Sequence, residues 1–151
     1  MHKKIKGTKI HAVVTCESLP VAMMIGSARE HEGRRLIPLM ESINIKHGRG
    51  RPKKRPKRIF ADSKYGMLLN KFYLGRKRIG YQIPSKERKI KPGRPKPFDK
   101  LAYNGVRYTI ERFFGWIKAF RRVIIRYERL AITYLGFVHL ACVMLYLRIL
   151  K

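Results

Sequence analysis

Residues 58–83 read RIFADSKYGMLLNKFYLGRKRIGYQI, and this stretch decides the fold of the chain. A short apolar run at residues 58–61 is followed by a helical segment near residues 65–76 and by a second apolar run at residues 79–83. The order strand, helix, strand is typical of a β-α-β unit, in which the two strands pair in parallel. The stretch therefore predicts an α/β domain.

The segments on either side of this unit extend the α/β pattern. Residues 8–25 contain two apolar, partly β-branched runs around a turn at Glu17-Ser18-Leu19-Pro20, which predicts a hairpin. Apolar residues recur at helical spacing in residues 32–42 and again in residues 101–127. Residues 131–150 predict a further, largely apolar helix. Together these elements predict a mixed sheet with flanking helices.

The charge of the chain indicates a polyanion as its partner. Its 36 Lys and Arg against 9 Asp and Glu give a formal net charge of +27, which self-repels unless a polyanion is bound. With 45% hydrophobic residues over 151 positions, the chain predicts one packed domain, residues 1–151, rather than a disordered tail. The charge is concentrated in two Pro- and Gly-containing loops, residues 46–58 and 84–100, which favours nucleic acid over a membrane surface.

Several other classes of protein are not indicated. Cys16 and Cys142 form no pair at a disulfide or zinc spacing, and we interpret His11, His31 and His139 as structural histidines. The N-terminus carries no secretory signal, and the apolar stretch at residues 134–147 is shorter than the roughly 20 residues of a membrane span. We therefore expect a cytoplasmic protein that does not enter a membrane.

Two carboxylates of this basic chain are candidates for chemistry. Asp62 follows the first apolar run, at a strand end where ligands collect in open α/β sheets, or it is the N-cap of a helix. On a helix Arg107, Glu111 and Lys118 share a face within about 40°, although Arg107 and Glu111 also fit an i,i+4 surface pair. Mg²⁺ and Mn²⁺ prefer carboxylate oxygen and promote phosphoryl transfer. Asp62 and Glu111 are therefore candidate metal ligands.

The basic residues are candidates for contacts with DNA. Residues 49–54, Arg-Gly-Arg-Pro-Lys-Lys, resemble the core of AT-hook peptides, which lay arginines into narrow minor grooves. The alternative is a solvated loop that contacts phosphates without reading sequence. Trp116 is a candidate for base stacking, and core packing is its alternative. The predicted DNA-binding residues are Arg49, Arg51, Lys53, Lys54, Arg55, Lys57, Arg94, Lys96, Arg121 and Arg122.

Two blocks of the sequence carry a resemblance to a known family. Residues 60–66 read Phe-Ala-Asp-Ser-Lys-Tyr-Gly, and residues 107–118 read Arg-Tyr-Thr-Ile-Glu-Arg-Phe-Phe-Gly-Trp-Ile-Lys. The first block and the spacing Arg-x₃-Glu-x₆-Lys of the second resemble DDE transposases of the insertion-sequence-five group, within the insertion-sequence-four-like superfamily. The resemblance covers nearly the whole chain.

The resemblance implies a fold, an activity and roles for the candidate residues. The fold is ribonuclease H-like, and three acidic residues hold two Mg²⁺ or Mn²⁺ ions that support cleavage and joining of DNA. Asp62 matches the second acid and Glu111 the third, with Arg107 and Lys118 as DNA-contacting or orienting residues. The implied partners are double-stranded DNA, at transposon ends and target, and further copies of the protein on that DNA, near a prokaryotic nucleoid.

The sequence departs from the family pattern at several points. Asn104 and Gly66 stand where the family often has Tyr and Asp, and the first catalytic aspartate of the family precedes the block matched by residues 6–11. We therefore expect an N-terminally incomplete catalytic domain without its first, central strand, from a split transposase with a separate N-terminal half or from a decayed copy. The alternatives are a non-catalytic basic nucleic-acid-binding protein and, more remotely, a peripheral membrane protein.

Overall fold

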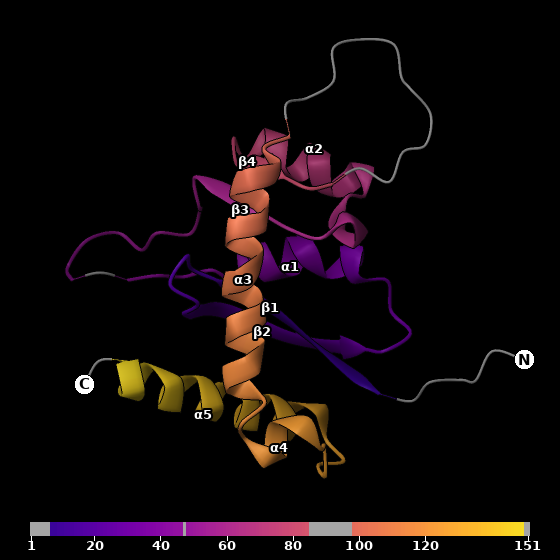
Figure 1. The fold of residues 1–151 in the computed structure, drawn as a ribbon, viewed down its shortest axis with the longest axis vertical. Coiled ribbons are helices and arrows are strands. Elements are labelled where there is room, and N and C mark those ends of the chain that lie inside the picture. The colour runs from indigo at the N-terminus through magenta and orange to yellow at the C-terminus, as the bar shows by residue number, and fades with distance from the viewer. Residues whose placement is uncertain (1–6, 47, 85–97, 150–151) are drawn as a thin grey trace, which may run out of the picture. The chain divides into compact units, whose positions relative to one another are not determined.

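The computed structural model describes residues 7–46, 48–84 and 98–149, which form two compact units (Figure 1). The first, here called the hairpin unit, consists of Met1–Glu30 and Tyr108–Lys151. The second, here called the β-α-β unit, consists of His31–Arg107. Each unit is described by itself.

The hairpin unit begins with the antiparallel pair that the sequence predicts. Strand β1, Thr8–Val14, pairs with strand β2, Pro20–Ser27, and a β-bulge shifts the register near the turn. The Thr15 hydroxyl stabilises the turn, because it accepts hydrogen bonds from the backbone N–H groups of Glu17 and Leu19, both at 3.2 Å. These bonds let the chain reverse within a few residues.

Three helices follow in the last third of the chain. They are α3, Lys100–Ile117, α4, Arg121–Ile124, and α5, Ala131–Ile149. The sequence predicts one helix over residues 101–127, and this is wrong in its length, because α3 ends at Ile117 and Phe120 takes an extended conformation before α4. The break turns the chain so that buried residues on both sides of it enter the same core.

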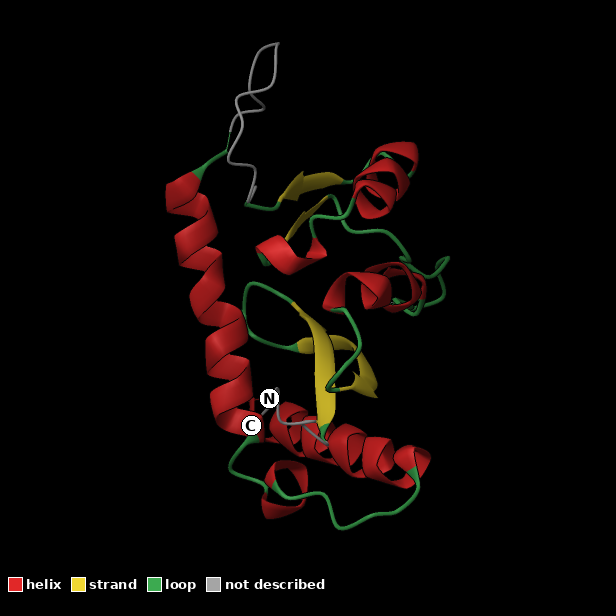
Figure 2. Ribbon diagram, turned by 90° about the vertical axis from the view of Figure 1, so that its right-hand side faces the viewer, coloured by secondary structure: helices red, strands yellow, loops and turns green. Residues whose placement is uncertain are grey.

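The core of the hairpin unit joins these helices to one face of the hairpin. The strand residues Ile10, Ala12 and Val14, which alternate along β1, pack against it together with residues of β2. Helix α5 lies beside β2 (Figure 2), and the Tyr134 hydroxyl donates to the Val123 carbonyl at 2.8 Å. The buried residues of this core are Phe113, Ile117, Val123, Tyr134, Val138, Ala141, Cys142 and Leu145.

Within the described part of the chain, α5 is the one helix long and apolar enough to cross a membrane by length and composition. A core helix of a soluble protein satisfies the same criteria. Five of its residues, among them Val138 and Leu145, are buried in the core of the hairpin unit.

The β-α-β unit confirms the parallel pairing predicted from residues 58–83. Strand β3, Arg58–Phe60, pairs in parallel with β4, Gly80–Gln82, and α2, Leu68–Arg76, connects them. Helix α1, Leu36–Glu41, packs against α2. Two 3₁₀ helices complete the unit: η1, Glu32–Arg35, and η2, Ser63–Tyr65.

The α/β class predicted from the sequence is confirmed. The described residues contain one antiparallel ladder, β1 with β2, and one parallel ladder, β3 with β4. The buried apolar residues of the β-α-β unit are Leu36, Leu39, Met40, Ile43, Leu74, Ile79 and Ile83.

Candidate functional site

Asp62 lies where β3 has just ended, as the sequence predicts. Its backbone is extended (φ −63°, ψ 156°), and it occupies the N-cap position of η2, yet its side chain makes no capping hydrogen bond. Instead Oδ1 accepts a hydrogen bond from the Ser63 hydroxyl at 3.0 Å, and the carboxylate is exposed. Asp62 thus stands at the N-cap position without capping η2 through its side chain, and its role as a metal ligand stays a prediction.

The turn after Asp62 is attached to η1 by an ion pair and a buried amide. Lys64 donates to Glu32 at 3.0 Å, and this pair raises the pKa of the Lys64 ammonium. Asn70 is 2% exposed, and its Nδ2 donates to the Gly33 carbonyl at 2.8 Å and to the Tyr65 carbonyl at 2.9 Å. Both amide protons are thus used, so a residue of α2 joins two segments that are more than 30 positions apart in the sequence.

The close contact between these segments requires a glycine at position 33. A Cβ added to Gly33 would lie 2.5 Å from the Met67 sulfur and 2.9 Å from the Lys64 carbonyl oxygen. The sulfur can move, whereas the backbone oxygen belongs to the turn that follows Asp62. Gly33 also donates its N–H to His31 Nδ1 at 3.1 Å, so this histidine caps η1. The Asp62 carboxylate is therefore displayed on a supported turn rather than on a free loop.

Two tyrosines lie within electrostatic range of Asp62. Burial raises the pKa of Tyr65 to about 12, and the charges of Glu32 and Asp62 add to the shift. Burial also raises the pKa of Tyr103, on α3; the charge of Asp62 raises it further, and the positive charge of Arg107 lowers it. Tyr103 is thus influenced by two of the predicted site residues, and its phenol stays protonated at neutral pH.

Arg107, Glu111 and Lys118 are all exposed. Arg107 and Glu111 lie four residues apart on α3, and Lys118 follows the last residue of that helix. Asp62 and Arg107 belong to the β-α-β unit, whereas Glu111 and Lys118 belong to the hairpin unit. An approach of Asp62 to Glu111 therefore stays a prediction.

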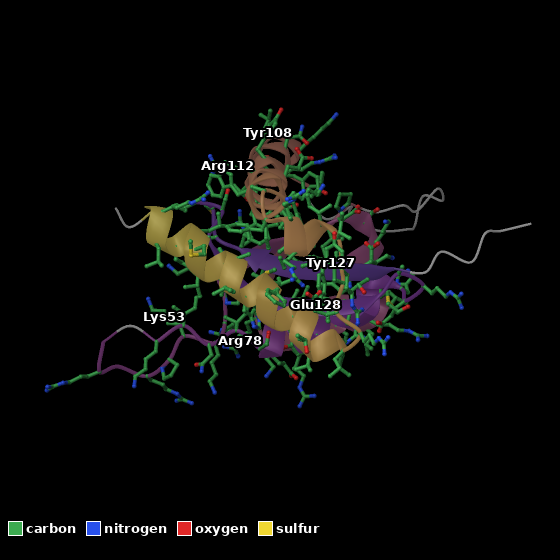
Figure 3. All side chains as sticks on the ribbon, turned by 90° about the horizontal axis from the view of Figure 1, so that it is seen from below. Lys53, Arg78, Tyr108, Arg112, Tyr127 and Glu128 are labelled. Carbon is green, nitrogen blue, oxygen red and sulfur yellow. The ribbon has the colours of Figure 1, made fainter. Side chains whose placement is uncertain are left out.

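The first basic loop presents its charged side chains to solvent. The loop is closed at its base by an isolated bridge between Ile45 and Lys53, with hydrogen bonds of 2.8 and 3.0 Å, and Arg55 donates to the Lys77 carbonyl at 3.0 Å. Figure 3 shows Lys53 on this loop. The predicted DNA-binding residues Arg49, Arg51, Lys53, Lys54, Arg55 and Lys57 are all exposed. Arg94 and Lys96, in the second loop, lie outside the described residues.

Arg121 and Arg122 begin α4 in the hairpin unit, and Arg122 has structural partners. Its Nη1 donates to Glu128 Oε1 at 2.9 Å, and its guanidinium lies 5.5 Å from the ring centroid of Tyr127 and 5.3 Å from that of Phe137. Desolvation would raise the pKa of Glu128, but backbone N–H groups and Arg122 stabilise its anion and hold the pKa below its ordinary value. Arg122 therefore stabilises the turn between α4 and α5.

Sequence reasoning missed the residues that support Asp62. Glu32 and Asn70 are ordinary polar residues in the sequence, and only their long-range hydrogen bonds reveal what they do. Among the residues that the structure describes, no group of three or more His, Cys, Asp or Glu side chains could hold a metal ion. The exposed carboxylate of Asp62, an oxygen donor with a single hydroxyl neighbour at Oδ1, nevertheless fits the hard ligand that Mg²⁺ prefers.

Comparisons with known proteins identify a family and similar individual proteins. The family described as "Transposase DDE domain" matches residues 2–146. A protein from Burkholderia cepacia, named as a transposase for insertion sequence element IS402, is 29% identical over 137 residues, which are 90% of this chain and 61% of that protein. One from Brucella ovis, named for insertion sequence element IS6501, is 48% identical over 42 residues, 28% of this chain and 32% of that protein. No solved structure matches.

Proposed function

Because this chain belongs to the DDE transposase domain family, we propose that it is part of an insertion-sequence transposase that cuts and joins DNA. The chain spans 61% of the length of the IS402 relative, so the reaction is proposed for the whole protein. The observation that carries the proposal is the Asp62 carboxylate, exposed at the end of β3 and displayed on a turn that Asn70 and the Lys64–Glu32 pair support. We place the element in the insertion-sequence-five group.

In this proposal two carboxylates of the chain and an acid outside it hold the metal ions. Asp62 and Glu111 supply oxygen ligands, and a separate N-terminal half supplies the third carboxylate. Mg²⁺ or Mn²⁺, when bound, activates the attacking oxygen and stabilises the leaving oxygen of a phosphodiester. The side chains of Asp62 and Glu111 are suited to this role, because hard divalent ions prefer carboxylate oxygen.

The other residues of the proposed site bind and orient the DNA. Arg107 and Lys118 are exposed cations at the two ends of the Arg-x₃-Glu-x₆-Lys spacing, and they would hold phosphates next to Glu111. The phenol of Tyr103, which interacts electrostatically with Asp62, can donate a hydrogen bond to a phosphate oxygen. The exposed basic loop at residues 46–58 would bind the flanking duplex, and further copies of the protein would assemble on the same DNA.

The second candidate is a basic nucleic-acid-binding protein without catalysis. The observation that favours it is the row of exposed cations in residues 49–57, which binds phosphates whether or not a metal site forms. The two candidates differ in what they require of Asp62 and Glu111. A binding protein needs neither carboxylate, whereas the transposase needs both.

The test supplies the N-terminal half and measures excision of a plasmid-borne element in the presence of Mg²⁺ or Mn²⁺. Asp62→Asn and Glu111→Gln should each reduce excision by at least about a hundredfold, since each removes a ligand charge, and should leave DNA affinity nearly unchanged. Glu17→Gln, in the exposed hairpin turn, is the matched control and should keep full activity. Excision that survives both site substitutions would refute the catalytic proposal and leave the binding protein.

A readout independent of activity is the paramagnetic effect of Mn²⁺ on the NMR spectrum of the chain. Mn²⁺ should broaden the amide signals of residues 62–66, and Asp62→Asn should remove that broadening. Signals of this turn that stay sharp at millimolar Mn²⁺, while the complemented protein is active, would mean that Asp62 is not a ligand.

A further inference from the structure

Arg112, on α3 in the hairpin unit, is held in place on two sides. Its Nε donates to the Ser18 hydroxyl at 2.8 Å, and its guanidinium carbon lies 5.5 Å from the ring centroid of Trp116, one turn further along the helix. Figure 3 shows Arg112 and Tyr108 on the same helix. An exposed arginine ordinarily samples many rotamers, and these two contacts favour one orientation of the Arg112 side chain.

The acceptor of this hydrogen bond, the Ser18 hydroxyl, belongs to a residue with an unusual backbone conformation in the hairpin turn. Ser18 is completely buried and has a φ of 67°, in the left-handed region that residues other than glycine rarely adopt. The conformation is enforced locally, because Ser18 N–H donates to the Thr15 carbonyl at 3.0 Å and Thr15 N–H donates to the Leu19 carbonyl at 2.9 Å. The turn therefore holds the backbone of Ser18 in place, and its hydroxyl accepts the bond from Arg112 on α3.

The two terminal nitrogens of Arg112 are left for a ligand. Among the described residues, the interactions of this guanidinium are the bond to Ser18 and the contact with Trp116, and both leave the outer edge of the fork unused. A planar fork of N–H donors fits two oxygens of one phosphate. Because the side chain is already oriented, binding would cost less conformational entropy than for a mobile arginine.

The helix surface around Arg112 is open to a large ligand. Tyr108, one turn earlier, is 72% exposed, and a Cβ added to Gly115, almost one turn later, would meet nothing within 4 Å. Arg112 lies about 100° around α3 from Glu111, so this surface differs from the face that carries the carboxylate. A chain with 36 basic and 9 acidic residues attracts polyanions to such a surface.

We propose that Arg112 binds a phosphate of the DNA backbone and that Ser18 and Trp116 are the residues that position it. This inference rests on the proposed DNA binding and extends it, because it adds a contact on a second face of α3, outside both basic loops. Its alternative is an Arg112 that only joins α3 to the hairpin.

The test places a competing charge beside Arg112 without removing any of its contacts. Gly115→Glu puts a carboxylate three residues from Arg112, where it can pair with the guanidinium. Gly136→Glu is the matched control, because a Cβ at that exposed glycine of α5 also meets nothing within 4 Å. Affinity of the full chain for a 30-base-pair duplex is measured by fluorescence anisotropy over a series of salt concentrations, with folding checked by circular dichroism.

The proposal expects Gly115→Glu to weaken binding about tenfold, Gly115→Gln to change it little, and Gly136→Glu to weaken it by less than about twofold. Arg112→Gln should lower the slope of log K against log salt by about 0.9, the loss of one phosphate contact. Arg129→Gln, which removes an exposed arginine of the same unit, should leave the slope unchanged. Ser18→Ala should weaken binding severalfold, because Arg112 keeps its charge and loses its support.

Equal effects of the two glycine-to-glutamate variants would overturn the proposal, since they would show only a loss of net charge. So would an Arg112→Gln variant that melts earlier yet binds DNA with the original affinity and slope, because Arg112 would then be purely structural. If the unmodified chain itself binds no duplex, the proposed DNA binding fails and this contact fails with it. Failure of the contact alone leaves the binding of the unmodified chain intact.

Discussion

Removing the amide of Asn70 should loosen the turn that displays Asp62. Asn70→Ala deletes two hydrogen bonds, of 2.8 and 2.9 Å, from a residue that is 2% exposed, and leaves the carbonyls of Gly33 and Tyr65 without that donor. At about 0.5–1.5 kcal/mol for each bond, the cost is about 1–3 kcal/mol. Since 1.36 kcal/mol is a factor of ten, local opening should become roughly 5- to 150-fold more frequent.

Hydrogen exchange measured by mass spectrometry tests this in the full chain. Amides of residues 31–35 and 62–66 should exchange faster in Asn70→Ala by that factor, whereas peptides from β1 and β2 in the other unit serve as the internal control. Asn104→Ala, at an exposed position of α3, is the matched control substitution. Exchange within twofold of the unmodified protein at both segments would refute the role assigned to Asn70.

The isosteric substitution Asn70→Asp adds a dependence on pH. A buried carboxylate facing two carbonyl oxygens has its pKa raised in the folded protein relative to the unfolded chain. The destabilisation is therefore complete above the raised folded pKa and is relieved as the pH falls toward the unfolded value near 3.9. Asn104→Asp, with the same change of charge at an exposed site, should show no such relief.

Three further predictions concern other parts of the chain. Gly33→Ala should destabilise the β-α-β unit by about 1–3 kcal/mol in urea unfolding, since its methyl group would lie 2.9 Å from the Lys64 carbonyl; a neutral result would mean that the turn can yield. The pKa of Glu128 is lower in the folded protein than in the unfolded chain, so the ionised carboxylate stabilises the hairpin unit above the unfolded pKa. This stabilisation is lost as the pH falls through the folded pKa. Arg122→Met should therefore make the stability of the hairpin unit depend less on pH in the acidic range. Joint replacement of the loop cations should flatten the salt dependence of DNA binding, and an unchanged slope would exclude residues 46–58 from the interface. The cations replaced are Arg49, Arg51, Lys53, Lys54 and Arg55.

The elements that sequence predicts well are those set by local pattern. The hairpin and the parallel β3–β4 pair follow from apolar runs separated by turn residues or by one helix, and both are confirmed. The break after Ile117 has no such signal, because residues 118–120 contain neither glycine nor proline. It results from tertiary packing. Ile117 and Val123 are both buried in the same core, whereas a straight helix would carry them on different faces.

The candidate site could be predicted only where a local sequence pattern marks it. Asp62 could be identified because a strand end is visible in the sequence, and its position after β3 is confirmed. Asn70 and Ser18 could not, because a buried polar side chain is recognisable only from the distant groups that it contacts, 37 residues away for Asn70 and 94 for Ser18. Whether Asp62 and Glu111 meet depends on how two units assemble, which no local pattern encodes.

The two cysteines of the hairpin unit differ in accessibility, and this gives the protein a chemical reporter of its own folding. Cys16 is exposed beside the hairpin turn, whereas Cys142 is buried in α5, where burial raises its thiol pKa to about 11. The raised pKa leaves only a small fraction of Cys142 as the reactive thiolate at pH 8, even before steric protection is counted. An alkylating reagent will therefore modify Cys16 at once and Cys142 only when the core opens, so the ratio of singly to doubly labelled chains measures core opening without any engineered probe.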